Sequence, residues 1–251
     1  MLTIIRERLR QKHRTTKYPK IEPVLPPRFR GLPQISATLS APELAAAVAS
    51  CPFAALSDRE KKLQIDLGRC LFCADCPAST EYGALTFSND YRLATNRRNE
   101  LLQEDEIYLL AEKLDKKMLK LFGRSLKLRQ ISAGGCNACE ADINVLGTLV
   151  FDLGRFGIQF VASPRHADGI LLTGPVTKNM HAALLDTYAA IPAPKLVIAS
   201  GACAISGGPF SGSPEVHNGI GDLFPVDLYI PGCPPHPYTI LDGLLRLLGK
   251  I

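Results

Sequence analysis

The chain has 251 residues and a mass of 27.3 kDa, enough for one large domain or two modest ones. With 46% hydrophobic and 21% charged residues it has an ordinary globular composition, which excludes wholesale disorder. The sequence shows no cleavable signal segment and no apolar stretch of the roughly 18 residues that a membrane span needs, so we expect a cytosolic compartment. In that compartment clustered cysteines are metal ligands more often than disulfides.

The first 38 residues predict a basic helix and an extended arm. Residues 1–20 contain seven Lys or Arg residues against the single acid Glu7, with apolar side chains interleaved at Leu2, Ile4, Ile5 and Leu9. This pattern is typical of a short amphipathic helix that lies on an anionic membrane surface or on a neighbouring subunit; a frayed, solvated terminus is the alternative. Residues 19–34 contain five prolines, which predict an extended arm.

Residues 39–123 predict a capped helix, a cysteine loop, a strand with a turn, and a longer helix. Ser40 with Glu43 three residues later predicts a capped helix that ends before Cys51. In the segment KLQIDLGRCLFC, apolar and polar residues alternate briefly before a cysteine loop. The segment ALTFSNDYRLAT predicts a strand and a turn after that loop. Leucines at helical spacing over residues 97–122 predict a long helix stopped by Gly123, and we interpret residues 97–123 as a linker helix between two domains.

From residue 124 the sequence alternates between short apolar strands and longer helical stretches. The strand candidates are LKLRQIS, IQFVAS, GILLTG, KLVIAS and VDLYIPG, with helices near 138–153, 177–190 and 237–249. This alternation predicts an α/β domain over residues 124–251, with an open, mostly parallel, flavodoxin-like sheet and helices on both faces.

The eight cysteines form two sets. Cys70, Cys73 and Cys76 have the C-x-x-C-x-x-C spacing that binds three corners of a cubane iron-sulfur cluster. Cys136 and Cys139 follow the first strand of the α/β domain, and later strands are followed by Cys203 and Cys233. All four should therefore converge at the carboxyl edge of the sheet. Structural zinc, in a zinc-stapled assembly protein, is the rival, but the triple cysteine run and the glycine-rich loops favour iron-sulfur.

Four motifs in the second half carry a family resemblance. GGCNACE, SPRHADGILLTGPVT, SGACAISGGPF and PGCPPHP resemble the small, cluster-bearing subunit of membrane-associated group 4 [NiFe]-hydrogenases, as in formate hydrogenlyase, and its relative, the 20-kDa subunit of complex I. The resemblance covers about residues 126–251. Complex I proteins carry adjacent cysteines at the first motif, whereas Cys136 and Cys139 are separated by two residues, which favours the hydrogenase side of the family.

The first half resembles the two-cluster ferredoxin-like subunit of the same complexes, the 23-kDa type of complex I. The resemblance rests on TTKYPKIEPVLPPRFRG and on IDLGRCLFCADC followed by NDYRLAT, and it implies a small ferredoxin-like α+β domain over residues 39–96 after an N-terminal segment over 1–38. The first cysteine run of that family is missing here, but its distant Cys-Pro survives as Cys51-Pro52, and Thr80 replaces the cysteine that would serve the absent cluster. We therefore expect one cluster in this half, with Cys51 as the fourth ligand. The alternative is that Cys51 is an ordinary buried thiol beside a three-cysteine cluster.

The two resemblances together imply a fused electron relay with two [4Fe-4S] clusters. Electrons would pass from an electron-donor iron-sulfur subunit or ferredoxin, through the two clusters, to a hydrogenase large subunit that holds the catalytic centre and reduces protons to H2. We expect no catalytic residue and no nickel ligand on this chain. The expected ligands are Cys51, Cys70, Cys73 and Cys76 for the first cluster and Cys136, Cys139, Cys203 and Cys233 for the second.

The resemblance also implies a location and an alternative function. The chain would be a peripheral subunit on the cytoplasmic face of the cytoplasmic membrane, in contact with membrane subunits. Two clusters, each carrying about −2, would reduce the formal charge of +5 to about +1, which gives no basis for a nucleic-acid partner. The alternative is the same scaffold in a quinone-linked complex I-like enzyme or in a hydrogenase-related complex without nickel.

Four other residues have two interpretations each. Glu140, directly after a predicted ligand, is a proton-relay candidate or a first-turn acid that favours the helix dipole. Arg165 and His166 either cap or form ion pairs, or they tune a cluster or an interface. His236 has the residue type of a ligand, but with Cys233 available we expect a surface or interface residue.

Overall fold

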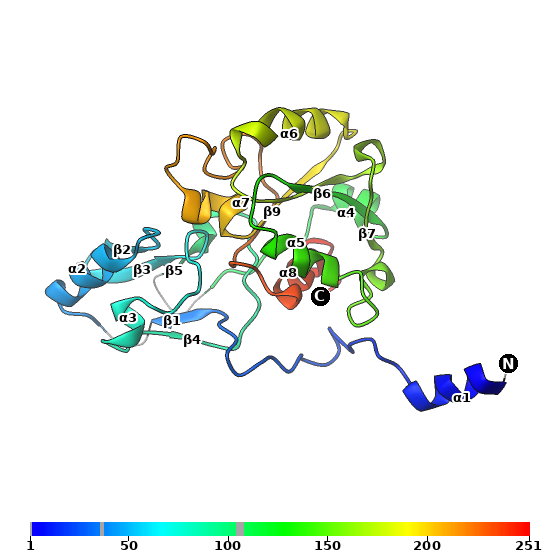
Figure 1. The fold of residues 1–251 in the computed structure, drawn as a ribbon, viewed down its shortest axis with the longest axis horizontal. Coiled ribbons are helices and arrows are strands. Elements are labelled where there is room, and N and C mark those ends of the chain that lie inside the picture. Colours follow the sequence, from blue (N-terminus) through cyan, green and yellow to red (C-terminus); the bar gives the residue numbers. More distant parts are fainter. Residues whose placement is uncertain (1, 36–37, 104–107) are drawn as a thin grey trace.

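The computed structural model describes residues 2–35, 38–103 and 108–251. The predicted basic helix is confirmed as α1 (Leu2–Gln11), which buries none of its residues and stands away from the body at the end of the arm (Figure 1). The arm is anchored on the C-terminal half of the chain. The Tyr18 hydroxyl donates to Asp242 at 2.8 Å, and the Arg155 guanidinium donates to the carbonyls of Thr16 and Tyr18 at 2.8 and 2.9 Å.

The N-terminal unit is built on short antiparallel strands. The strands are β1 (Pro33–Ile35), β2 (Leu56–Arg59), β3 (Lys62–Asp66), β4 (Leu85–Phe87) and β5 (Leu102–Gln103), and the helical segments are α2 (Ala41–Ser50), α3 (Pro77–Thr80) and the 3-10 turn η1 (Arg98–Leu101). Strands β2, β3 and β5 form one antiparallel sheet, and β1 pairs with β4. The predicted helix cap is confirmed, because Glu43 accepts from the Ser40 amide at 2.8 Å and from its hydroxyl at 2.5 Å.

The C-terminal unit contains a five-stranded sheet in which every pairing is parallel. The strands are β6 (Leu126–Ser132), β7 (Ile158–Phe160), β8 (Gly169–Thr173), β9 (Leu196–Ser200) and β10 (Leu228–Ile230). Their spatial order, β10-β9-β8-β6-β7, is the flavodoxin-like order, so the predicted class of sheet is confirmed. The chain order reverses between β6 and β8, and in such folds ligands bind at the carboxyl edge beside this switch point.

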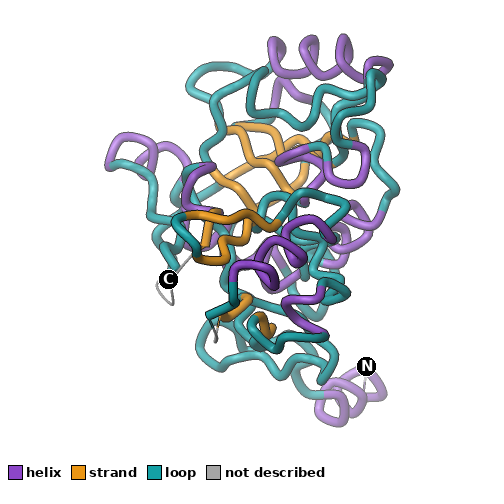
Figure 2. Tube along the Cα trace, turned by 90° about the vertical axis from the view of Figure 1, so that its left-hand side faces the viewer, coloured by secondary structure: helices purple, strands orange, loops and turns teal. Residues whose placement is uncertain are grey.

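Helices cover both faces of the parallel sheet (Figure 2). They are α4 (Lys116–Phe122), α5 (Ala138–Val145), α6 (Lys178–Ala190), α7 (Ala202–Ser206) and α8 (Pro237–Leu247), with 3-10 turns η2 (Leu153–Phe156), η3 (Pro164–His166) and η4 (Gly208–Phe210). Alternate strand residues point to opposite faces: Leu171 packs in the core under α5 and α8, whereas Ile170 and Leu172 pack in the core on the α6 and α7 side. Because both faces are covered, the central strands are buried apolar runs.

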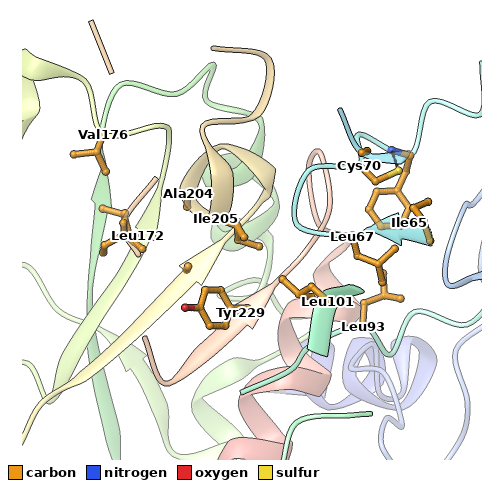
Figure 3. Packing of buried hydrophobic residues seen from close by; sticks show 14 of the residues in the cluster. Ile65, Leu67, Cys70, Leu93, Leu101, Leu172, Val176, Ala204, Ile205 and Tyr229 are labelled. Atoms are coloured by element: carbon orange, nitrogen blue, oxygen red, sulfur yellow. Dashed lines mark hydrogen bonds between the residues drawn. The ribbon is translucent and has the colours of Figure 1, made fainter. Parts of the chain in front are cut away.

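One hydrophobic core joins the two units. It extends from Leu172 and Val176 of the parallel-sheet unit, through Ile205 and Tyr229, to Leu67, Leu101 and Cys70 of the N-terminal unit (Figure 3). A backbone bridge adds to this contact, since Thr95 and Tyr229 exchange amide-to-carbonyl hydrogen bonds of 3.0 and 2.8 Å along the outer edge of β10.

The long linker helix predicted over residues 97–122 is wrong for most of its length. Residues 104–107 lie outside the described residues, and within the rest only α4 is α-helical, ending at Gly123 as predicted. The backbone of this segment finds partners far away in the sequence: the Ala111 amide donates to Ala94 at 2.7 Å and the Leu114 amide to Leu247 at 2.9 Å. Its apolar side chains therefore do not share one helix face: Leu101 packs in one core and Phe122 in the other, whereas Leu109 is exposed. The helix expected near 138–153 likewise ends at Val145 and is followed by the turn η2.

Candidate metal centres

Four cysteines from three regions of the sequence line one cavity at the carboxyl edge of the parallel sheet. Cys136 lies in the loop after β6, Cys139 in the first turn of α5, Cys203 in α7 after β9, and Cys233 in the loop after β10. The sequence predicted this convergence from the carboxyl-edge rule, and the structure brings all four residues together.

Glycines allow the backbone to approach the sulfurs of this cavity. A Cβ on Gly201 would lie 2.6 Å from Cys139 Sγ, and one on Gly208 would lie 2.8 Å from Cys203 Sγ. Both glycines also have positive φ, +91° and +55°, which L side chains rarely adopt. The positions of the Cys139 and Cys203 sulfurs therefore depend on the absence of a side chain at these two glycines.

The cavity disfavours thiolates unless a cation is present. Burial raises the pKa of the Cys203 thiol to about 11, with smaller contributions from Cys233, Cys136 and Glu140. Burial likewise raises the pKa of Cys139, helped by Glu140 and the three other cysteines. Thiolates clustered away from water repel one another, so a bound metal that neutralises them would release protons on binding.

Two polar side chains behind the cavity were not predicted from the sequence. The Thr173 hydroxyl, at the end of β8, donates to the Glu140 carboxylate at 2.5 Å. Ser200 ends the neighbouring strand β9, and its fully buried hydroxyl has no hydrogen-bond partner among the described residues. The carboxyl-edge rule that found the cysteines also applies to these strand-end residues and was the available signal.

Glu140 lies in the wall of the same cavity and is buried. Its carboxylate is within the first turn of α5 and is hydrogen-bonded by Thr173, so both interpretations of this residue fit its position. Arg165 and His166 lie elsewhere: they are exposed in η3, which precedes β8, whereas the cavity lies beyond the other end of that strand. Neither contributes to the cavity.

His236 caps a helix rather than facing the four sulfurs. Its Nδ1 accepts the Tyr238 amide at 3.2 Å at the start of α8, and its ring stacks on Tyr238 at 5.6 Å between centroids. Burial lowers the pKa of His236, which favours the neutral ring that this cap requires.

The second set of cysteines surrounds Cys70 in the N-terminal unit. Burial, with smaller contributions from Cys73, Cys51 and Cys76, raises the pKa of Cys70 to about 12, so all three of these cysteines lie within electrostatic range of Cys70. Backbone amides point at two of the sulfurs: Phe72 donates to Cys70 Sγ at 3.3 Å, and Ala55 donates to Cys51 Sγ at 3.4 Å.

All eight cysteines lie in the described ranges, and none forms a disulfide. Within those ranges, no three His, Cys, Asp or Glu side chains are close enough together to hold a single metal ion.

Comparisons with known proteins agree with this architecture. A family described as "NADH ubiquinone oxidoreductase, 20 Kd subunit" matches residues 136–247. The probable membrane-bound hydrogenase subunit mbhJ of Pyrococcus furiosus is 41% identical over 140 residues, which cover 56% of this chain and 84% of that relative. The chain belongs to this family. Formate hydrogenlyase subunit 7 of Escherichia coli is 45% identical over 134 residues, covering 53% of this chain and 52% of the relative.

The family also includes quinone-linked members. One subunit of the NADH-quinone oxidoreductase of Citrifermentans bemidjiense is 49% identical over 117 residues, covering 47% of this chain and 68% of the relative. These relatives are subunits of hydrogenase or complex I-like enzymes, so this family member is an oxidoreductase subunit, and the resemblance of its second half to such subunits is confirmed.

Proposed function

We propose that the chain is the electron-transfer iron-sulfur subunit of a membrane-associated hydrogenase complex of group 4 type, and that it holds two [4Fe-4S] clusters. The observation that carries this proposal is the cavity at the carboxyl edge of the sheet, which four cysteines line together. Thiolates are the ligands that iron-sulfur clusters require, and four of them complete a cubane.

The arrangement of the sulfurs fits a cluster better than a zinc ion. A structural zinc draws its four ligands to within about 2.3 Å of a single point. Here the four thiols line one cavity, yet among the described residues no three such side chains lie close enough together to hold a single ion. Zinc is the alternative, and metal analysis distinguishes it from iron.

We propose the first cluster for the N-terminal unit, held by Cys51, Cys70, Cys73 and Cys76. The support is the electrostatic proximity of the other three cysteines to Cys70 and the two amide-to-sulfur hydrogen bonds, since such bonds tune cluster potentials. The ferredoxin-like origin of residues 39–96, and with it the fusion of two subunits, is part of the proposal. In this proposal residues 1–38 are the N-terminal arm, residues 124–251 are the second domain, and residues 97–123 connect the two domains.

Each cluster supplies one-electron redox chemistry when it is bound, and the residues of the chain supply the surroundings. The cysteines hold the clusters, the buried walls exclude water, and backbone amides donate to ligand sulfurs. Catalysis belongs to a partner large subunit, and the electrons come from an iron-sulfur subunit or a ferredoxin.

The exposed sulfurs mark where the catalytic partner would lie. Cys136 and Cys233 are exposed while Cys139 and Cys203 are more deeply placed, so one side of the second site is open on the isolated chain. A partner that covers this side would bring its own centre next to the cluster. Glu140, in the same wall, is the proton-relay candidate toward that partner.

The membrane association is also part of the proposal. Helix α1 exposes Leu2, Ile4 and Leu9 beside a row of arginines, which is the composition of a helix that binds an anionic membrane surface or a membrane subunit. None of the helices in the described parts of the chain has the length and apolarity that crossing a bilayer requires. We place the chain as a peripheral subunit at the cytoplasmic face.

The quinone-linked alternative is supported by the 49% identity to an NADH-quinone oxidoreductase subunit. The spacing of Cys136 and Cys139, together with the two hydrogenase relatives, favours the hydrogenase side. The deciding residues belong to the partner: a large subunit with two C-x-x-C pairs for nickel supports the hydrogenase, and their absence from the neighbouring gene product removes that claim.

The test is metal analysis of the full chain purified without oxygen together with its neighbouring subunits. We expect about eight irons and eight sulfides per copy of this chain, after subtraction of the partners' iron, and two reducible signals in low-temperature electron paramagnetic resonance (EPR). Zinc in place of iron overturns the proposal. A content of about four irons per chain means that the chain holds one cluster instead of two.

A further inference from the structure

The two cysteine-bearing regions touch through one buried hydrogen bond. Ser206, at the end of α7, donates its hydroxyl to the carbonyl of Gly68 at 2.8 Å, and Ser206 is only 8% exposed. Cys203 lies three residues before Ser206, and Cys70 lies two residues after Gly68. The bond therefore joins the loop of the first cysteine set to the helix that carries a ligand of the second.

The Gly68 loop is held rigidly against this helix. A Cβ on Gly68 would lie 2.7 Å from Ile205 Cγ2, so the loop backbone touches α7 directly. The Gly68 amide donates to Asp66 at 2.8 Å, and Arg98 donates to both oxygens of that carboxylate at 2.8 and 2.6 Å. Figure 3 shows Leu101 between Ile205 and Tyr229 of the parallel-sheet unit on one side and Leu67 of the loop on the other.

We propose that Ser206 is a positioning residue for electron passage between the two sites. Ser206 completes a bonded route between the two sites. The route runs from Cys70 along the backbone to the Gly68 carbonyl, across the hydrogen bond to Ser206, and along α7 to Cys203. Electrons tunnel more readily through covalent and hydrogen bonds than across gaps between atoms, and this route contains a single non-covalent link. The inference rests on the proposed function, because it requires a cluster at each end.

The step moves one electron. Cys51, Cys70, Cys73 and Cys76 would hold the cluster that gives up the electron, and Cys136, Cys139, Cys203 and Cys233 would hold the cluster that accepts it. No bond or proton would change in the chain. Ser206 is not itself a ligand of either site, and its role is to set the rate of this step.

The experiment compares Ser206→Ala with Ser211→Ala, an exposed serine five residues further on, in the full chain with both clusters loaded. A photoreduced flavin delivers less than one electron per chain, and freeze-quench EPR follows the electron from the first cluster to the second. We expect a several-fold slower transfer in Ser206→Ala, an unchanged rate in Ser211→Ala, and the same final distribution of the electron in all three proteins. Ser206→Thr, which keeps the hydroxyl, should restore the rate.

The outcomes separate the two claims. An unchanged rate in Ser206→Ala with both clusters present overturns the inference and leaves the proposed function intact. A changed final distribution, or loss of iron in that variant, also overturns it, because the residue then supports one site rather than joining two. A wild-type chain with fewer than two clusters removes the proposed function itself.

Discussion

Replacing Cys51 with serine tests the division of the eight cysteines into two sets of four. Cys51 follows α2, where its sulfur accepts the Ala55 amide at 3.4 Å and lies within electrostatic range of Cys70. Serine keeps the shape of the side chain but does not supply a thiolate. Loss of one hydrogen bond costs the metal-free fold only about 0.5–1.5 kcal/mol, so the variant should fold. Its iron content should fall from about eight to about four per chain.

The assay is iron and sulfide analysis of anaerobically purified chain, with EPR to show which signal disappears. The second site should keep its signal, because Cys51 lies in the other unit. Thr80→Ala is the matched control: Thr80 occupies the position where the resembled ferredoxins place a cysteine for the absent cluster, and this variant should keep about eight irons. Unchanged iron and unchanged electron delivery in Cys51→Ser would refute the assignment and leave Cys51 an ordinary thiol.

Three further variants test other parts of the structure. Gly201→Ala places a Cβ 2.6 Å from Cys139 Sγ at a φ of +91°, so iron loss should be confined to the second site, as EPR and iron analysis can verify. His236→Asn tests an acid-sensitive helix cap. Burial lowers the pKa of His236, so the stabilisation that the neutral ring gives the fold is present above about pH 6.5 and is lost as the pH falls through the folded-state pKa. The melting temperature of the variant should therefore decline less on acidification than that of the wild type. Tyr18→Phe removes a 2.8 Å hydrogen bond to the buried carboxylate of Asp242, which should cost about 1–3 kcal/mol in denaturant unfolding and expose the arm to limited proteolysis.

The parallel sheet could be predicted because its signal is local. Strands such as β8 and β9 are buried on both faces, and a strand of this kind is a short, continuous apolar run bounded by glycine or proline. Once the strands are in place, the meeting of Cys136, Cys203 and Cys233 follows from the geometry of a parallel sheet, in which every strand ends at the same edge.

The residues that the sequence could not reveal depend on contacts between distant segments. The leucines of residues 97–122 have helical spacing, but Ala111 and Leu114 satisfy their amides on carbonyls of Ala94 and Leu247, and a backbone bonded in this way cannot also form a helix. The hydroxyl of Ser206 likewise acquires meaning only when the Gly68 loop packs on α7. No local pattern encodes either pairing.

The shared core gives the proposed fusion a physical consequence. Two separate subunits would have to fix the distance between their clusters through a surface that can dissociate. Here Leu67 and Leu101 of the first unit are fully buried in the same core as Ile205 of the second. The outer edge of β10 is covered by the bridge from Thr95, so the first unit also protects an otherwise free strand edge. The separation of the two cysteine sites is therefore set by the folding of one chain rather than by the docking of two.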